Sequence, residues 1–294
     1  MRVLVSGGTG FVGDALCQSL RGAGHAVTLV SRHPEHASSP AVGWAELGPA
    51  VAESDAIVNL AGEPIAARRW SPGQKRLILE SREWATATLV DAIAAAPVRP
   101  SVLVSASAVG YYGPRGDEEI DESAGPGADF LASVCEAWER EALRAEGLGV
   151  RVVRLRIGIV LGPDGGALAR MLPPFRAFVG GPLGSGAQWM SWIHRDDLTG
   201  LVIDALENPA YRGAVNATAP HPVTNRDFTR GLADVLARPA VLRAPAFVLR
   251  LALGELASML LTGQRVLPGV ATHLRYVWRY PDLGPALHAS VRRR

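Results

Sequence analysis

Short runs of apolar residues alternate with segments of helical spacing along the first 162 residues. The first run, residues 3–5, is entirely aliphatic, a pattern typical of a strand buried in a parallel sheet. Similar runs follow at residues 26–30, 56–60, 102–105 and 150–155. Because helical segments separate these runs, the pattern predicts an α/β fold with a doubly wound parallel sheet.

The segments between the runs carry signals for the starts of helices. Residues 14–23 are expected to form the first helix. A later helix begins after Ser71, with Pro72 in its first turn, and runs to about residue 96. Asp129 is expected to cap a helix that extends from residue 130 to about residue 146.

The pattern changes after residue 162. Pro173 and Pro174 are expected to break a helix, and residues 180–186 to form a mobile, glycine-rich loop. An apolar helix then runs to about residue 206, with Asp197 as its simplest cap. We therefore predict a core of residues 1–162, completed by segments that return from about residues 190–218, and a smaller substrate-covering part at residues 163–294.

Three glycines, Gly7, Gly10 and Gly13, follow the first apolar run at intervals of three residues. The first permits a tight turn, the second lets the backbone approach a pyrophosphate, and the third lets the helix pack closely on the strand. The N–H groups at the start of that helix would face the phosphates. The segment predicts a dinucleotide site; the alternative is an ordinary turn.

The end of the second apolar run indicates which dinucleotide is bound. An acidic residue about 20 positions after the glycines would hold a ribose 2′-hydroxyl, but Ser31 and Arg32 stand there. Arginine pairs with a 2′-phosphate through two hydrogen bonds, whereas an acid would repel it. We therefore expect NADP(H). The alternative is that Arg32 only caps a surface loop.

Composition and charge narrow the possible partners. Of the 294 residues, 48% are hydrophobic and 20% are charged, which is enough for a large core. The net charge is +2, and basic residues form a run only in the three arginines at 292–294, which we expect to be solvated. We therefore expect no nucleic-acid partner.

The chain also lacks the sequence features of a membrane or secreted protein. The most apolar stretch, residues 247–261, contains Arg250 and Glu255, so no membrane partner is expected. A predicted strand begins almost at residue 1, which favours a cytoplasmic location without a signal peptide. Cys17 and Cys135 are expected as thiols in helices and not as a disulfide or a metal site.

Several motifs spread along the chain occur together in one family. They are Gly7-Gly-Thr-Gly-Phe-Val-Gly13, Asn59-Leu-Ala-Gly62, Ser107 with Tyr111-Tyr-Gly113, Arg156 with Gly162, and Trp192-Ile-His194 with Asp197. These resemble the extended short-chain dehydrogenases/reductases. Ala61-Gly-Glu63-Pro, Met171-Leu-Pro-Pro-Phe175 and Gly263-Gln-Arg265 narrow the resemblance to an atypical branch described as nucleoside-diphosphate-sugar epimerase-like.

The resemblance covers nearly the whole chain and implies a Rossmann fold, NADP(H), and a small-molecule substrate held between the sheet and the C-terminal part. We expect the chain to be a monomer or a homodimer. Arg82 would contact the cofactor, or it is a solvated residue on the surface of its helix. The residues expected to hold the cofactor are Gly7, Thr9, Gly10, Phe11, Val12, Gly13, Ser31, Arg32, Leu60, Ala61, Gly62, Arg82 and Val160.

The chain departs from this family at the catalytic pair Tyr-x-x-x-Lys, in which the tyrosine carries the proton and the lysine lowers its pKa. The pair would lie at the start of the helix that follows Asp129. The residues available there are Leu131 with Cys135, or Phe130 with Val134. Since Lys75 is the single lysine and no tyrosine precedes it by four positions, the pair occurs nowhere in the chain.

Ser107 and Tyr111 are therefore the candidate catalytic residues. Ser107 would hydrogen-bond a substrate oxygen, or it is a turn residue at a strand end. Tyr111 would replace the missing phenol, or it packs with Tyr112 as a buried aromatic wall. The next candidates are His194, whose alternative is a structural hydrogen bond, and Glu63.

Two functions are compatible with these residues. The first is an NADP(H)-dependent oxidoreductase or epimerase acting on a small carbonyl or polyol compound, either free or nucleotide-linked. The second is an NADP(H)-binding protein with little or no catalysis, such as a redox sensor or an interaction module. Ser107 and the C-terminal cover favour the first, and the missing Tyr–Lys pair favours the second.

Two tryptophans, Trp189 and Trp192, have two possible roles. They would stack on a ring of a ligand, or they pack in the core.

Overall fold

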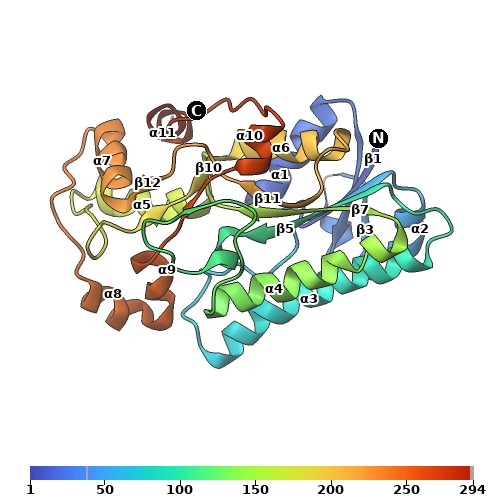
Figure 1. Cartoon of the computed structure of the whole chain (residues 1–294), viewed down its shortest axis with the longest axis horizontal. Coiled ribbons are helices and arrows are strands. Elements are labelled where there is room, and N and C mark those ends of the chain that lie inside the picture. The colour runs from blue at the N-terminus through green and yellow to red at the C-terminus, as the bar shows by residue number, and fades with distance from the viewer. Residues whose placement is uncertain (38, 292–294) are drawn as a thin grey trace.

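A seven-stranded parallel sheet with helices on both faces forms the centre of the computed structural model, which describes residues 1–37 and 39–291 (Figure 1). The three arginines at 292–294 lie outside the described residues. The strand order is β11-β7-β5-β4-β1-β2-β3, and every neighbouring pair is parallel. The predicted fold class is confirmed. The sheet strands are β1 (Arg2–Ser6), β2 (Ala26–Ser31), β3 (Ala41–Gly43), β4 (Ala56–Asn59), β5 (Val102–Ala108), β7 (Arg151–Ile157) and β11 (Gly213–Ala217).

The chain reverses its direction of travel across the sheet between β1 and β4. From β1 it proceeds outward through β2 and β3, and from β4 it proceeds the other way through β5, β7 and β11. Ligands of such sheets bind beyond the carboxyl ends of the strands at this reversal.

Helices cover both faces of the sheet and form much of the C-terminal part. The helices are α1 (Phe11–Gly22), α2 (Leu47–Ala52), α3 (Pro72–Ala95), α4 (Phe130–Leu143), α5 (Gly166–Arg176), α6 (Arg195–Glu207), α7 (Asn225–Leu236), α8 (Ala246–Leu253), α9 (Ser258–Leu261), α10 (Gly269–His273) and α11 (Leu283–Val291).

Alternation along the strands divides the core between the two faces of the sheet. Val3 and Val5 pack on one face with α1 and α6, while Leu4 packs on the other face with α2, α3 and α4. Figure 1 shows α3 and α4 side by side along that second face. Successive strand residues point to opposite faces, so a continuous aliphatic run supplies both cores.

A third, smaller core holds the C-terminal part together. It contains Phe175 from α5, Phe228 and Leu232 from α7, and Leu287 from α11, packed around Trp192. Trp192 is fully buried, as in the core alternative for this residue. The short strands near this part are β6 (Glu119–Ile120), β8 (Ile159–Leu161), β9 (Trp189–Met190), β10 (Trp192–His194), β12 (Val223–Thr224) and β13 (Arg265–Val266).

The expected helix break at Pro173 and Pro174 is wrong. Helix α5 runs from Gly166 to Arg176 with both prolines inside it. The prolines lie near its C-terminal end, where their fixed φ is compatible with a helix. Their carbonyls still accept from Ala177 and Val179 at 3.0 and 2.9 Å, and the buried Phe175 ring anchors the turn in the third core.

The expected cap of α6 is also wrong, because His194 and not Asp197 is the N-cap residue. His194 Nδ1 accepts a hydrogen bond from the N–H of Asp196 at 3.2 Å. Asp197 lies inside the helix, buried, and its carboxylate accepts from the N–H groups of Arg279 and Tyr280 at 2.6 and 2.9 Å. Asp197 thus attaches the C-terminal segment to α6.

Among residues 1–37 and 39–291, no helix combines the length and the apolar character that crossing a membrane requires. The same residues contain no cluster of three histidine, cysteine, aspartate or glutamate side chains suited to a metal ion. Cys17 and Cys135 are buried free thiols in α1 and α4.

The cap at His194 predicts an acid-sensitive contribution to stability. Burial lowers the pKa of His194 to about 4, below the ordinary value of about 6.5. The unfolded chain therefore binds more protons between these values, and the contribution is lost as the pH falls. Going from about pH 7 to about pH 4.5, we expect this group to cost roughly 2 kcal/mol of unfolding free energy.

Urea denaturation of wild type and His194→Asn at both pH values measures this effect. Asparagine retains a capping oxygen but does not titrate, and Asp196, Arg195 and Arg279 remain in both proteins. The variant should lose less stability on acidification than wild type. An equal loss in the two proteins would contradict the role assigned to His194.

Candidate functional site

The glycine loop after β1 has the geometry that its sequence predicts. Gly7 has a φ of +72°, and a side chain there would meet the backbone of Leu60 at 2.7 Å. A Cβ on Gly13 would collide with the carbonyl oxygen of Gly7. A Cβ on Gly10 would meet only that same oxygen, at 3.4 Å. Gly10 therefore presents open backbone on the side where a ligand would approach.

The N-terminus of α1 lies directly after this loop and has no side-chain cap. Gly10 is the N-cap residue, and its own N–H donates to the carbonyl of Gly7 at 3.1 Å. The next N–H groups, beginning with Phe11 and Val12, are therefore available to an anion at the positive end of a 12-residue helix. Thr9 lies in the exposed turn beside them.

The ends of β4 and β2 flank the loop on either side. Leu60 donates its N–H to the carbonyl of Ser6 at 3.0 Å, which holds residues 60–62 against the end of β1. At the end of β2, Ser31 Oγ accepts from the N–H of His33 at 3.0 Å. Arg32 is exposed, and within residues 1–37 and 39–291 it forms no ion pair.

The chain after β8 covers the same loop. Gly165 and Gly166 pack against the ring of Phe11, so neither has space for a Cβ. The Arg195 guanidinium lies 4.9 Å from the centre of that ring. Val160, in β8, pairs with Ile193 of β10. The β8–α5 connection and the start of α6 thus close over residues from the glycine loop.

Arg82 is buried against the end of β4, so its alternative as a solvated helix residue is wrong. Its Nη1 donates to the carbonyls of Glu63 and Ile78, both at 3.0 Å. A side chain on Gly62 would meet the Arg82 guanidinium at 3.0 Å. Burial lowers the pKa of Arg82, although its high ordinary value leaves it charged.

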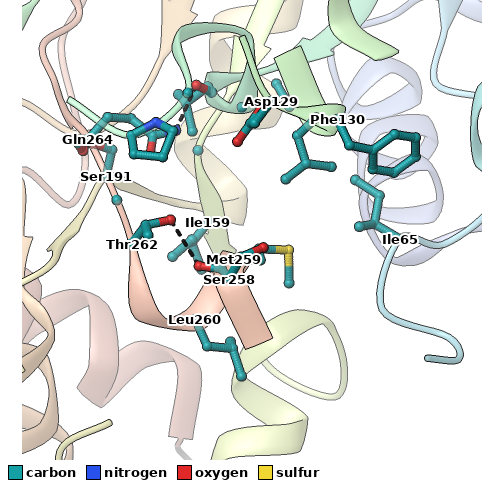
Figure 2. Close-up of a pocket in the computed structure, with 18 of the residues that line it drawn as sticks. Ile65, Asp129, Phe130, Ile159, Ser191, Ser258, Met259, Leu260, Thr262 and Gln264 are labelled. Carbon is teal, nitrogen blue, oxygen red and sulfur yellow. Dashed lines mark hydrogen bonds between the residues drawn. The ribbon is translucent and has the colours of Figure 1, made fainter. Parts of the chain in front are cut away.

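A cavity of about 540 Å³ lies between the carboxyl ends of β5 and β7 and the C-terminal part. Figure 2 shows Asp129 and Phe130, at the start of α4, on one side of it, with Ser258 and Met259 of α9 on another and Ile65 beside the Phe130 ring. Ala108, Val109 and Gly110, directly after the buried part of β5, form one wall. Both the sheet domain and the C-terminal part are therefore needed to form this cavity.

The positions of the missing Tyr–Lys pair lie in the wall of this cavity. Leu131 and Cys135 both line it, and so do Phe130 and Val134, so neither alignment has a phenol or an amine at these two positions. Cys135 Sγ lies 3.7 Å from the carbonyl oxygen of Ala108. Burial raises the pKa of Cys135 to about 11, so the group is a neutral thiol near pH 7.

Ser107 lies inside β5, since this strand continues to Ala108, and its alternative as a turn residue is wrong. It is 2% exposed, and its Oγ donates to Glu139 Oε1 at 2.8 Å. Arg156 contacts both carboxylate oxygens of Glu139, at 2.8 and 3.0 Å, and Arg154 donates at 2.8 Å. Glu139 thus accepts four hydrogen bonds beneath the cavity.

Tyr111 and Tyr112 pack edge to face, with ring centres 5.3 Å apart. The Arg156 guanidinium lies 3.5 Å from the centre of the Tyr111 ring. Tyr112 is fully buried, and its hydroxyl donates to Asn216 at 2.7 Å and accepts from Arg156 at 2.9 Å. Burial raises the pKa of Tyr112, so its phenol stays neutral at ordinary pH.

The remaining candidates lie apart from one another. His194 caps α6 with its ring 4.1 Å from that of Tyr280. The N–H of Glu63 donates to Ser81 Oγ at 3.0 Å, beside Arg82. Trp189 lines the cavity, and its indole N–H donates to Asp117 at 2.7 Å. The structure therefore brings Trp189 to the cavity, whereas Ser107, Tyr111, His194 and Glu63 are not among the residues that line it.

Glu139 is the residue that the sequence analysis missed. Its signal is its spacing, because Cys135, Glu139 and Ala142 follow one another by four and three positions and share the buried face of α4. An acidic residue on a buried helix face requires a cationic partner, and Arg154 and Arg156 alternate along the nearby strand β7.

Comparisons with known proteins agree with this geometry. Residues 3–217 match the model of the NAD dependent epimerase/dehydratase family, and residues 244–290 match a domain of unknown function, DUF1731. The chain is 47% identical to the epimerase family protein SDR39U1 homolog, chloroplastic, of Arabidopsis thaliana, covering 99% of this chain and 87% of that protein. It is 43% identical to human epimerase family protein SDR39U1, covering 99% and 100%.

Solved structures support the same relationship. The crystal structure of human epimerase family protein SDR39U1 (isoform 2) with NADPH superimposes with a TM-score of 0.93 at 41% identity, covering 99% of each chain. A UDP-glucuronic acid 4-epimerase from Bacillus cereus gives a TM-score of 0.79 at 17% identity, over 99% of this chain and 98% of that one, which shows the shared fold. The family resemblance expected from the motifs is confirmed.

The buried carboxylate of Glu139 predicts a large stability effect. In Glu139→Ala, Arg156 would remain buried without its partner, and we expect a loss of about 3–5 kcal/mol in unfolding free energy. The double variant Glu139→Leu with Arg156→Met should lose less than Glu139→Ala alone, because no unpaired charge is left behind.

Chemical denaturation of these variants measures the effect, with Arg140→Ala as the matched control. Arg140 is the next residue of α4 and forms an exposed ion pair with Glu83 at 3.3 Å. Its loss should cost less than about 1 kcal/mol. Similar losses for Glu139→Ala and Arg140→Ala would show that the buried network does not contribute as assigned.

Proposed function

Because the chain belongs to the NAD dependent epimerase/dehydratase family, we propose that it is an NADP(H)-dependent oxidoreductase or epimerase acting on a small carbonyl or polyol compound. The observation that carries the proposal is the uncapped N-terminus of α1 under the open backbone of Gly10. Free N–H groups at a helix N-terminus favour a phosphate. The fold places this terminus at the strand reversal, where dinucleotides bind.

NADP(H) is favoured over NAD(H) by the end of β2. The exposed guanidinium of Arg32 is free to pair with a 2′-phosphate, and Ser31 lies next to it. The human relative solved with NADPH is 41% identical to this chain. We assign cofactor contacts to the glycine loop (Gly7 to Gly13), Ser31 with Arg32, residues 60–62, Arg82 and Val160.

In this proposal the cofactor exchanges a hydride with a substrate carbon, and the chain holds both molecules and excludes water. Ser107 and Tyr111 are our candidates for contacting the reacting oxygen. They flank Ala108, Val109 and Gly110, which line the cavity at the end of β5. Ser107 donates a hydrogen bond to Glu139, and Arg156 holds Glu139 in place. Arg156 also lies against the Tyr111 ring.

A second function, NADP(H) binding with little or no catalysis, is favoured by the wall of the cavity. Leu131 with Cys135, or Phe130 with Val134, would occupy the positions of the family's proton carrier and its lysine, and all four line the cavity. A thiol whose pKa is about 11 is a poor proton donor near neutral pH. A chain with this wall would bind the cofactor and signal its redox state, or present it to a partner.

Cofactor titration tests the first part of the proposal. We expect NADPH to bind more tightly than NADH, and Arg32→Ala to weaken NADPH by roughly ten- to a hundredfold, since a charge-assisted pair contributes about 1.5–3 kcal/mol. NADH affinity should not change. Isothermal titration of the apo-protein gives these constants.

The matched control is Arg21→Ala, which removes an exposed arginine from the last turn of α1. It should leave both affinities as they are. Equal affinities of wild type for the two cofactors, or full NADPH affinity in Arg32→Ala, would refute the assignment of Arg32.

The catalytic candidates predict slow turnover that depends on both residues. Ser107→Ala and Tyr111→Phe should each reduce kcat by roughly tenfold or more, because each removes a hydrogen-bonding group near the reacting oxygen. NADPH affinity should stay nearly constant. The decrease of NADPH absorbance with a panel of carbonyl compounds measures turnover.

Ser101→Ala provides the control, since Ser101 immediately precedes the same strand at its other end and donates to the carbonyl of Asp55 at 3.0 Å. It should leave kcat unchanged. If turnover is found and both candidate variants retain it in full, Ser107 and Tyr111 are not catalytic. If NADPH binds and no panel member reacts, the second function is supported.

A further inference from the structure

We propose that the cavity takes an uncharged, mainly apolar carbonyl compound, about the size of a fused two-ring ketone, and not a sugar nucleotide. This inference rests on the proposed function, because it names the substrate class of the same site. Three features of the cavity carry it: the side chains of its wall, the state of its charged groups, and the polar atoms that remain free.

Apolar side chains line the cavity from most of the elements that surround it, whereas α3 and α7 contribute only Lys75, Arg82 and Asn225. The α4 side supplies aromatic and branched residues, the loop before α3 adds an indole, and the C-terminal part adds three methionines. At about 540 Å³, the cavity is within the usual range for small ligands. Among the apolar lining residues are Trp70, Phe130, Trp138, Met171, Met190 and Met259.

The charged residues of the wall already make contacts within the protein, and among their charged-group atoms only the Nε of Arg82 is buried without a partner among the described residues. Of the lining residues, Lys75, Arg82, Asp129 and Glu255 carry charge, two of each sign. Lys75 Nζ donates to Glu255 at 2.8 Å and lies 4.7 Å from the centre of the Phe130 ring. Arg82 Nη1 donates to two backbone carbonyls, and Asp129 Oδ1 accepts from the N–H of Ala132 at 2.9 Å.

A sugar nucleotide would bring two phosphate charges into this wall. Moving them out of water without cations or hydrogen-bond donors is strongly unfavourable. Lys75 would have to leave Glu255 to bind them, and the guanidinium of Arg82, which is 7% exposed, is held by its Nη1 on two backbone carbonyls. An uncharged ligand meets no such penalty, and each buried apolar carbon gains free energy.

Two amide side chains provide the polar contacts that such a ligand needs. The Gln188 Nε2 group donates to the carbonyls of Leu183 and Leu260 at 3.0 and 2.7 Å, and its buried Oε1 has no partner among the described residues. Asn225 Oδ1 accepts from the N–H of Leu183, while its Nδ2 reaches only the Met190 sulfur, at 3.4 Å.

The unpartnered Gln188 oxygen and the Asn225 amide, whose only acceptor is a sulfur, match one donor and one acceptor on an otherwise apolar ligand. A hydroxyl of the ligand would donate to Gln188, and an oxygen other than the reacting one would accept from Asn225. In the reductive direction, the reacting carbonyl carbon would take a hydride from NADPH and its oxygen would take the proton of the Tyr111 phenol, which regains one from water, so that an alcohol and NADP⁺ are formed. The cavity therefore selects a compound with one or two oxygens on a hydrocarbon ring system.

Isothermal titration with NADP⁺ present tests the inference, because the oxidised cofactor cannot reduce a bound ketone. The probes are α-tetralone, a two-ring ketone, and UDP-glucose. We expect α-tetralone to bind at least tenfold more tightly than UDP-glucose. Equal or tighter binding of UDP-glucose, or no binding of α-tetralone, would overturn the inference.

Variants of the wall locate the binding. Met259→Lys introduces a cation at a residue that is 37% exposed, so the fold should tolerate it, and it should weaken α-tetralone at least tenfold. Leu251→Lys, at a position 80% exposed in α8, should have no effect. Ala167→Phe fills part of the cavity without charge and should also weaken α-tetralone. Full affinity in both wall variants would place the ketone elsewhere and overturn the inference.

Failure of the proposed function gives a different result. If NADP⁺ does not bind, the cofactor assignment is wrong. The same α-tetralone and UDP-glucose titrations without the cofactor then still decide between the two ligand classes.

Discussion

The buried carboxylate of Glu139 is the interaction on which the arrangement of the site depends. It accepts from Ser107 of β5 and from Arg154 and Arg156 of β7, so one side chain of α4 fixes two strands of the sheet. A buried charge is tolerated only when it is paired and hydrogen-bonded. Because all four contacts must be made together, α4 has one position relative to the carboxyl ends of these strands.

The same network extends to the C-terminal part. Arg156 donates to Tyr112, whose hydroxyl donates to Asn216 of β11, and the Asn216 amide donates to the carbonyl of Leu267 at 2.9 Å. Glu122 adds bonds to the N–H groups of Asn216 and Val270. The cavity lies between the two parts that this network joins. Its shape is therefore set by polar contacts beneath it, while its surface stays apolar.

The sequence predicted those features that depend on neighbouring residues. The strands, the glycine loop, the cap at Asp129 and the missing Tyr–Lys pair follow from local spacing. The cap at Asp197 was wrong because contacts with Arg279 and Tyr280, more than 80 positions away, determine its role. The helix break at Pro173 was wrong because burial of Phe175 stabilises the turn. Gln188 and Asn225 gave no signal, since only the fold brings them to the cavity.

Lys75 gives the site a chemical property that most proteins lack. It is the single lysine among 294 residues, and its amine spans from α3 to Glu255 at the edge of the cavity. Among side chains, a reagent specific for amines will therefore modify this point alone. A fluorophore attached there would respond to the environment at the edge of the cavity, and a carbodiimide would join the Lys75 amine to the Glu255 carboxyl as an amide, with loss of water to the reagent, without any engineered residue.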